Sequence, residues 1–321
     1  MKNKTARTKK IDLSTLYIYV GVIAIILIFS ILCKMNGRDF LTINNIQNII
    51  TQSSVIAVIA IGSSIVILTG GIDLSSGSIV GFIGIFTGLL IKGGWPIAVA
   101  CILAILMGAL FGFINGLFTS YAKVPAFIVT LGTMQIARGL ALLINTGKPI
   151  SSFPEGLSLI MNFKIFDIPI SIFYVFVLYT VIIIVMSYTR FGRHIYSIGG
   201  NAKASMLSGV RVKKVETIAY VLSGTFAAIG GLLLLSRLSY ADPNAGSSYE
   251  MNAIASTVIG GISLSGGRGK IGNTLVGALI LGSLTTGLQI LNVPTYYQTI
   301  ITGIVIIAAV YVDKSKERKA E

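Results

Sequence analysis

The sequence predicts an all-α integral membrane protein, a polytopic bundle of about ten transmembrane helices with an internal parallel repeat. Hydrophobic residues make up 54% of the 321 residues, whereas charged residues make up only 11%, and the mean hydropathy is +0.87. Apolar runs that approach the roughly 20 residues needed to cross a hydrocarbon core recur along the chain. A short motif rich in glycine and serine occurs twice. These observations leave no segment for a separate soluble catalytic domain.

Ten apolar segments are the expected helices, and the eighth is short enough to be a half-helix. They cover residues 16–33, 46–69, 76–91, 96–120, 125–145, 168–188, 215–238, 251–264, 271–291 and 295–313. The first follows a basic stretch, as in a secretory signal, but no small-residue cleavage site follows it. We therefore expect it to be retained as the first helix of one transmembrane domain, 16–313.

The distribution of charge predicts the orientation of these helices. The formal net charge is +14, but most of the 25 Lys and Arg residues fall in segments that share one side when the N-terminus is cytoplasmic. This pattern argues against nucleic-acid binding. It predicts cytoplasmic tails at 1–15 and 314–321, a cytoplasmic segment at 189–214, and an external segment at 146–167.

Glycines at helical spacing predict close helix packing. Because glycine has no side chain, residues four apart let two backbones approach each other within the membrane. Such spacing occurs at Gly77 and Gly81, at Gly84 and Gly88, and at Gly108, Gly112 and Gly116.

The repeated motif is GGIDLSSG at Gly70–Gly77 and GGISLSGG at Gly260–Gly267. In the predicted topology both copies run in the same direction, which indicates a parallel repeat. Asp73 in the first copy has two interpretations. A negative charge is favoured at a helix N-terminus, and a carboxylate within the membrane can also line a transport pathway.

The stretch from Leu264 to Arg268 looks like the signature motif of an ABC ATPase, but no GxxxxGK[ST] phosphate loop occurs in the chain. We interpret the stretch as a coincidence and expect no bound nucleotide or cofactor. Cys33 and Cys101 lack metal-binding spacing. The single His194 and the scattered acidic residues form no catalytic constellation, so a transport role is favoured over an enzyme.

Four motifs in order resemble the permease subunits of ribose-type ABC sugar importers. They are GGIDLSSG at 70–77, GFINGLF with PAFIVTLGTMQIARGLALL at 112–118 and 125–143, RFGRHIYSIGGNAKASMLSGV at 190–210, and YADPNAGSSYEMNAIASTVIGGISLSGGRGKIG at 240–272. The resemblance implies a bacterial inner-membrane protein that forms a homodimer in the lipid bilayer. It also implies two partners, an ABC ATPase subunit that binds the ATP and an extracytoplasmic sugar-binding protein.

By the same resemblance, the middle of the segment 189–214 is the part that couples the permease to the ATPase. We expect a short helix between Gly200 and Gly209 whose small residues, including Ser205, seat against the partner. The coupling residues are Gly199, Gly200, Asn201, Ala202, Ala204, Leu207, Ser208 and Gly209.

Polar residues within apolar segments are candidates for the substrate pathway, because such residues are costly in a membrane. They are Asp73, Asn115, Gln135, Arg138 and Asn252. For Arg138, snorkelling towards the outer interface is an alternative, and for Asn115 a role in helix packing is favoured. The sequence departs from the family pattern at Asn252, where Asp is expected, and at Thr286, where Asn is expected.

The segment from Tyr240 to Glu250 is expected to be an external loop. Its polar residues Asp242, Asn244 and Glu250 are candidates for docking the binding protein. Two other interpretations stay open: an ABC permease for nucleosides or branched-chain amino acids, and an ion-coupled secondary transporter. The latter would be expected to carry several acidic residues at mid-membrane, where Asp73 is the only candidate.

Overall fold

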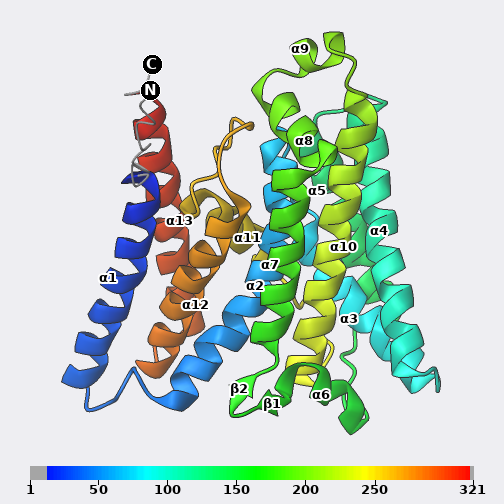
Figure 1. Ribbon diagram of the computed structural model, residues 1–321. Coiled ribbons are helices and arrows are strands. Elements are labelled where there is room, and N and C mark those ends of the chain that lie inside the picture. The colour runs from blue at the N-terminus through cyan, green and yellow to red at the C-terminus, as the bar shows by residue number, and fades with distance from the viewer. Residues whose placement is uncertain (1–12, 319–321) are drawn as a thin grey trace, which may run out of the picture.

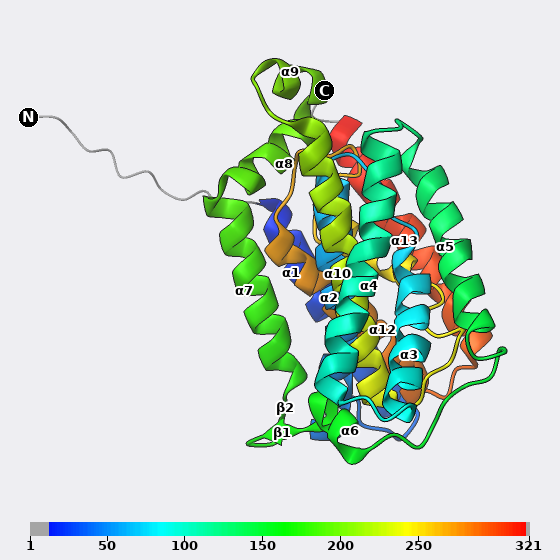
Figure 2. The same ribbon diagram turned by 90° about the vertical axis from the view of Figure 1, so that its right-hand side faces the viewer.

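The computed structural model describes residues 13–318, which form a bundle of α-helices with one short β-hairpin (Figures 1 and 2). The helices are α1 (Leu13–Met35), α2 (Ile43–Leu68), α3 (Ser76–Lys92), α4 (Ile97–Ser120), α5 (Ala126–Leu143), α6 (Glu155–Asn162), α7 (Ser171–Tyr188), α8 (Arg190–Gly200), α9 (Ala202–Leu207), α10 (Val212–Leu238), α11 (Tyr249–Ile259), the 3-10 helix η1 (Ile271–Asn273), α12 (Thr274–Ile290) and α13 (Thr295–Arg318). The antiparallel strands β1 (Lys164–Ile165) and β2 (Ile168–Pro169) form the hairpin.

Seven segments of the described chain are long and apolar enough to cross a membrane. They are Ile18–Met35, Ile43–Leu68, Ile97–Ser120, Ala126–Leu143, Ser171–Tyr188, Val212–Leu238 and Ile271–Ile290. Helix α3 and the apolar part of α13, Thr295–Ala308, are shorter. The chain is therefore an all-α polytopic membrane protein, as the composition predicted.

Helices α2 and α10 form the centre of the bundle. In the most apolar 18-residue stretch of each helix, 83% is buried in α2 and 72% in α10, against 11% in α1. Helix α10 packs against α2, α3 and α4, and α2 packs against α11 and α12. From Ser53 to Leu68 every residue of α2 is buried, and a largely apolar surface all round the helix suits this position. The less buried helices α1, α4, α5 and α7 lie around the centre.

The bundle has two distinct ends (Figure 1). Helices α8 and α9 protrude at one end, the α8–α9 end, where α1 begins and α13 finishes. Helix α6 and the hairpin cover the opposite end, the α6 end. Both described ends of the chain therefore lie at the α8–α9 end of the bundle.

The glycines of α4 form the close helix contact that their spacing predicted. A Cβ atom built at Gly116 would lie 2.7 Å from Cα of Thr217, and one at Gly108 or Gly112 would meet the carbonyl oxygen of Gly224 or Tyr220 on α10. A methyl group at any of these positions would force the backbones of α4 and α10 apart. The prediction of a helix interface is confirmed here.

Several expected helix ends are wrong, and two of the expected connecting segments contain secondary structure. The segment 189–214 is largely helical, as α8 and α9, and 146–167 contains α6 and β1. The eighth helix finishes at Ile259 because Gly260 and Gly261 follow, and Gly261 adopts a positive φ of 81°. Helix α13 continues to Arg318, past the expected boundary at 313. Residues 1–12 of the predicted N-terminal tail and 319–321 of the C-terminal tail lie outside the described residues.

Candidate functional site

The last turn of α8 packs directly against the end of α2 and the second copy of the repeated motif. A Cβ atom at Gly199 would overlap the carbonyl oxygen of Leu68 and would lie 3.0 Å from Cα of Gly267. The backbone N–H of Gly267 donates to that same Leu68 oxygen at 3.0 Å. A Cβ atom at Gly266 would lie 2.9 Å from the backbone nitrogen of Gly70. Three glycine-rich segments therefore meet at one point, which we call the glycine junction.

Helix α9 is the short helix that the sequence predicted between Gly200 and Gly209. Asn201 caps it, because its Oδ1 accepts the N–H of Ala204 at 2.9 Å. Gly209 finishes the turn with a φ of +84°, a conformation that glycine adopts without strain. The hydroxyl of Ser208 donates to the carbonyl of Ala204 at 2.9 Å.

The outer face of α9 is apolar and exposed. Met206 is 61% exposed and Leu207 is 85% exposed, and both alanines of the helix, Ala202 and Ala204, are exposed as well. Ser205 was expected on this face, but it is buried, with its Oγ 2.6 Å from Oγ of Ser197 on α8. The surface available to a partner therefore consists mainly of alanine, methionine and leucine side chains, with Lys203 also exposed.

Asp73 is buried just before α3, where its side chain links this turn to α10 by hydrogen bonds. Its Oδ1 accepts the N–H of Ser75 at 2.9 Å and the hydroxyl of Ser75 at 2.6 Å. Its Oδ2 accepts the hydroxyl of Ser223 on α10 at 2.7 Å. Both carboxylate oxygens are thus hydrogen-bonded, as a buried charge requires.

Asn115 belongs to the same hydrogen-bonded network. Its amide nitrogen donates to Oγ of Ser75 at 2.9 Å, and its Oδ1 accepts the hydroxyl of Thr133 on α5 at 2.6 Å. Asp73 and Asn115, two of the predicted pathway residues, therefore meet through Ser75. Sequence reasoning did not single out Ser75, Ser223 or Thr133, because serine and threonine are common in membrane helices and carry no distinguishing pattern.

The segment after α10, which the sequence predicted to be an external loop, packs against α3. It runs along the glycines of α3, away from the α6 end. Ala241 lies at Gly84, with its Cβ 3.9 Å from a Cβ built there; the carbonyl oxygen of Ala245 would lie 2.6 Å from a Cβ at Gly81. Glu250 meets Gly77 at the beginning of α3. Gly77, Gly81 and Gly84 of α3 thus pack mainly against a segment of turns before α11.

Arg138 of α5 holds this segment in place. Its guanidinium donates to the carbonyl oxygens of Pro243 and Ala245, the latter at 2.9 Å. Glu250 and Asp242 contribute negative charge near the guanidinium. Arg138 therefore points into the bundle, as a charged residue in a membrane helix does when it has a partner.

The other predicted site residues lie apart from these groups. Gln135 is exposed on α5, and Asn252 is half-buried on α11. Asp242 accepts the backbone N–H of Asn244 at 2.7 Å, whereas the Asn244 side chain is exposed. The structure therefore joins Asp73 to Asn115 and Arg138 to Glu250, but it does not join all the pathway residues into one site.

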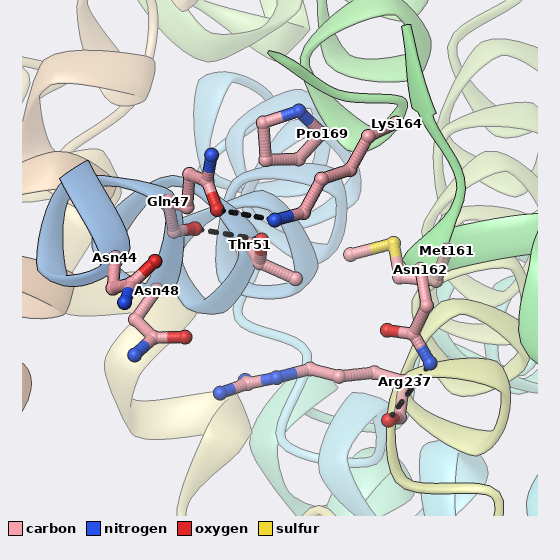
Figure 3. Close-up of a pocket in the computed structure, with 9 residues that line it drawn as sticks. All are labelled: Asn44, Gln47, Asn48, Thr51, Met161, Asn162, Lys164, Pro169 and Arg237. Carbon is pink, nitrogen blue, oxygen red and sulfur yellow. Dashed lines mark hydrogen bonds between the residues drawn. The ribbon is translucent and has the colours of Figure 1, made fainter. Parts of the chain in front are cut away.

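A polar pocket of about 540 Å³ opens near the α6 end (Figure 3). Asn44, Gln47, Asn48, Thr51, Met161, Asn162, Lys164, Pro169 and Arg237 line it. Sequence reasoning missed this pocket. Its only signal was the spacing of the four polar residues of α2, which lie on one helical face. In the part of the chain that the structure describes, no group of three or more His, Cys, Asp or Glu side chains is placed to hold a metal ion.

Comparison with known proteins gives a consistent result. Residues 45–310 match the family described as "branched-chain amino acid transport system / permease component". The chain is 40% identical to the ribose import permease protein of Haemophilus influenzae over 91% of both chains. It is 41% identical to that of Bacillus subtilis, covering 93% of this chain and 92% of the relative. It is 35% identical to the D-allose transport system permease protein of Escherichia coli, covering 98% and 97%. No solved structure matches.

Proposed function

The chain belongs to the family of branched-chain amino acid transport system permease components, and we propose that it is the permease subunit of an ATP-driven, binding-protein-dependent monosaccharide importer. The observation that carries the proposal is about 40% identity to ribose permeases along more than nine-tenths of the chain. Other relatives are named for D-allose and xylose. Ribose or a similar monosaccharide is therefore favoured over branched-chain amino acids or nucleosides.

The proposed topology has ten spans. Seven are the long apolar segments, α3 and α13 supply two more, and α11 with the turn that follows it supplies the tenth. The α8–α9 end is cytoplasmic, because basic residues gather there. Those of α8, α9 and the start of α10 are Arg190, Arg193, Lys203, Arg211, Lys213 and Lys214. The α2–α3 and α11–α12 pairs form the parallel repeat.

We propose that α9 docks into an ABC ATPase subunit and that the glycine junction carries its movement to the transmembrane helices. The exposed Leu207 and Met206 provide an apolar contact. Gly199 transmits the displacement, because it touches the end of α2 and the turn before α12 without an intervening side chain. Two copies of the chain then alternate between outward and inward access, and the sugar-binding protein docks at the α6 end.

The three candidate docking residues differ in how much side-chain surface they offer to a binding protein. Asn244 is exposed, whereas Glu250 is directed at α3 and Arg138 and offers little surface to a partner. Asp242 is engaged with the backbone of Asn244. Of the three residues, Asn244 is the best contact for a binding protein.

Reconstitution tests the proposal. The purified chain, an ATPase subunit and a ribose-binding protein in proteoliposomes should import D-ribose only when ATP is supplied. The chain alone should hydrolyse no ATP, because it lacks a phosphate loop. Uptake driven by an ion gradient without ATPase would instead support a secondary transporter. Measurable hydrolysis by the isolated chain would contradict the assignment of ATP to the partner.

A further inference from the structure

The pocket near the α6 end has a composition that points to a particular ligand chemistry. Carboxamides from two elements line it, namely Asn44, Gln47 and Asn48 of α2 and Asn162 of α6. Two cations, Lys164 and Arg237, also line it, and among the described residues no acidic side chain does. Its volume of about 540 Å³ lies within the roughly 300–1,000 Å³ usual for small-molecule sites. Buried Met161 adds an apolar surface.

Some of these polar groups are already hydrogen-bonded within the protein. Lys164 Nζ donates to Oε1 of Gln47 at 2.7 Å, and Nε2 of Gln47 donates to the carbonyl oxygen of Asp167 at 2.7 Å. The amide nitrogen of Asn162 lies 3.4 Å from the carbonyl oxygens of Ser236 and Arg237. These contacts fix the wall that α6 and the hairpin form.

Other groups have no such partner. The side chains of Asn44 and Asn48 and the guanidinium of Arg237 form no hydrogen bond with the residues that the structure describes. Arg237 extends from α10 across the pocket towards the carboxamides of α2 (Figure 3). The pocket therefore presents the donors of Arg237 together with two carboxamides that can each donate and accept.

These donors and acceptors favour ligands that both donate and accept hydrogen bonds over ligands that only accept them. A carboxylate or a fully ionised phosphate group only accepts hydrogen bonds, so it could accept from Arg237 and from the Nδ2 atoms of the carboxamides but would leave their Oδ1 atoms without a donor. A sugar hydroxyl both donates and accepts. It can accept from Arg237 and donate to Oδ1 of Asn44 or Asn48. Hydroxyl groups of a neutral polyol are thus the better match.

We infer that this pocket is an outer binding site for the hydroxyl groups of a monosaccharide, with Arg237, Asn44 and Asn48 as its ligand-binding residues. The inference rests on the proposed function, which makes the α6 end external. None of the pathway residues that the sequence suggested lines the pocket. The site would receive sugar at the outer face of each permease subunit, and its openness to solvent implies weak binding.

Saturation-transfer NMR on the full chain in lipid nanodiscs tests the site, with D-ribose, D-allose and D-xylose as separate probes. At least one sugar should receive saturation from the wild-type protein. Arg237→Gln and Asn48→Ala should each weaken binding about tenfold, the scale of one lost hydrogen bond to a charged or buried group. Asn45→Ala is the matched control, because Asn45 neighbours Asn44 on α2 but does not line the pocket.

Three results would overturn the site: no binding of any of the three sugars, equal binding by Arg237→Gln and Asn45→Ala, or tighter binding of inorganic phosphate than of sugar. ATP-dependent uptake by the assembled importer separates this failure from failure of the proposed function. Wild-type uptake with an unchanged maximal rate in Arg237→Gln would reject the pocket and keep the importer. Absence of ATP-dependent uptake of any of these sugars would reject the importer itself.

Discussion

The two glycine- and serine-rich turns, 70–77 and 260–267, differ only where Asp73 replaces Ser263 and where Ser76 replaces Gly266. In the first copy, the carboxylate ties α3 to α10 through Ser223, and α3 begins directly at Ser76. In the second, Gly266 and Gly267 adopt φ values of +84° and +70°, and helix α12 begins only at Thr274. The backbone conformation of two glycines delays the helix.

These differences give the two copies different roles. The first is fastened by charged side-chain hydrogen bonds inside the bundle, whereas the second meets Leu68 and α8 through backbone atoms. Two similar local sequences thus have different roles. The first copy links α3 to α10 by hydrogen bonds, and the second copy contacts the coupling segment. The difference lies in what each copy touches across the chain.

Breaking the second copy's contact should have the largest effect on transport. Gly199→Ala places a methyl group against the carbonyl oxygen of Leu68 and the backbone of Gly267, and backbone atoms cannot move aside as a flexible side chain can. Overpacking of this kind costs about 1–3 kcal/mol or more. We expect ATP-dependent sugar uptake to fall more than about tenfold.

Gly200→Ala is the matched control, since a Cβ atom there has nothing within 4 Å. This variant should keep most of the wild-type uptake. Membrane abundance and co-purification of the ATPase would be measured for both variants. Equal uptake by the two would show that the glycine junction does not transmit movement.

Breaking the first copy should destabilise the fold itself. Asp73→Ala removes the acceptor for the hydroxyls of Ser75 and Ser223 and leaves both buried without their partner. A hydrogen bond to a charged group contributes about 1.5–3 kcal/mol, so we expect a loss of about 3 kcal/mol in the free energy of unfolding. Chemical denaturation in detergent micelles measures it.

Asp73→Asn is the control for charge, because it keeps one acceptor oxygen and should lose about half as much stability. If Asp73→Ala unfolded at the same denaturant concentration as the wild type, the hydrogen bonds to Ser75 and Ser223 would carry no net stability. The comparison between the two copies would then rest on backbone conformation alone.

The sequence predicted the parts of this fold that depend on local pattern. Apolar length located the long helices, and the spacing of Gly108, Gly112 and Gly116 predicted a close helix contact that α10 fills. Gly200, Asn201 and Gly209 correctly bracketed α9. These features follow from a few neighbouring residues, so a single sequence contains them.

The features that the sequence missed depend on distant partners. Gly77 and Gly81 require a close neighbour, but their spacing does not say that the neighbour is the segment of turns carrying Ala245 instead of a helix. Likewise, nothing near Asp73 identifies Ser223 as its partner, and nothing near Arg237 shows that α2 supplies carboxamides opposite it. Such pairings are set by the packing of the whole bundle.

Removing the hydroxyl of Ser263 in the second copy should lower the free energy of unfolding less than removing the carboxylate of Asp73 does. The hydroxyl of Ser263 accepts the backbone N–H of Ser265 at 3.2 Å, a neutral and longer hydrogen bond. Ser263→Ala should therefore cost about 1 kcal/mol of unfolding free energy. Denaturation under the conditions used for Asp73→Ala gives the comparison. If Ser263→Ala lost as much unfolding free energy as Asp73→Ala, side-chain hydrogen bonds would stabilise the two turns equally.

Introducing the carboxylate into the second copy should have the smallest effect. In Ser263→Asp the new side chain can accept the N–H of Ser265, as Asp73 accepts that of Ser75, because the two turns correspond residue by residue. The basic residues Arg268 and Lys270 nearby in the sequence favour the added charge. The carboxylate would take over the hydrogen bond from the N–H of Ser265 that the Ser263 hydroxyl accepts in the wild type. We expect a change within about 1 kcal/mol, since the stronger charged hydrogen bond offsets the burial of the carboxylate at this buried position. Stabilisation by several kcal/mol would show that a carboxylate in this motif stabilises the fold without a distant partner such as Ser223.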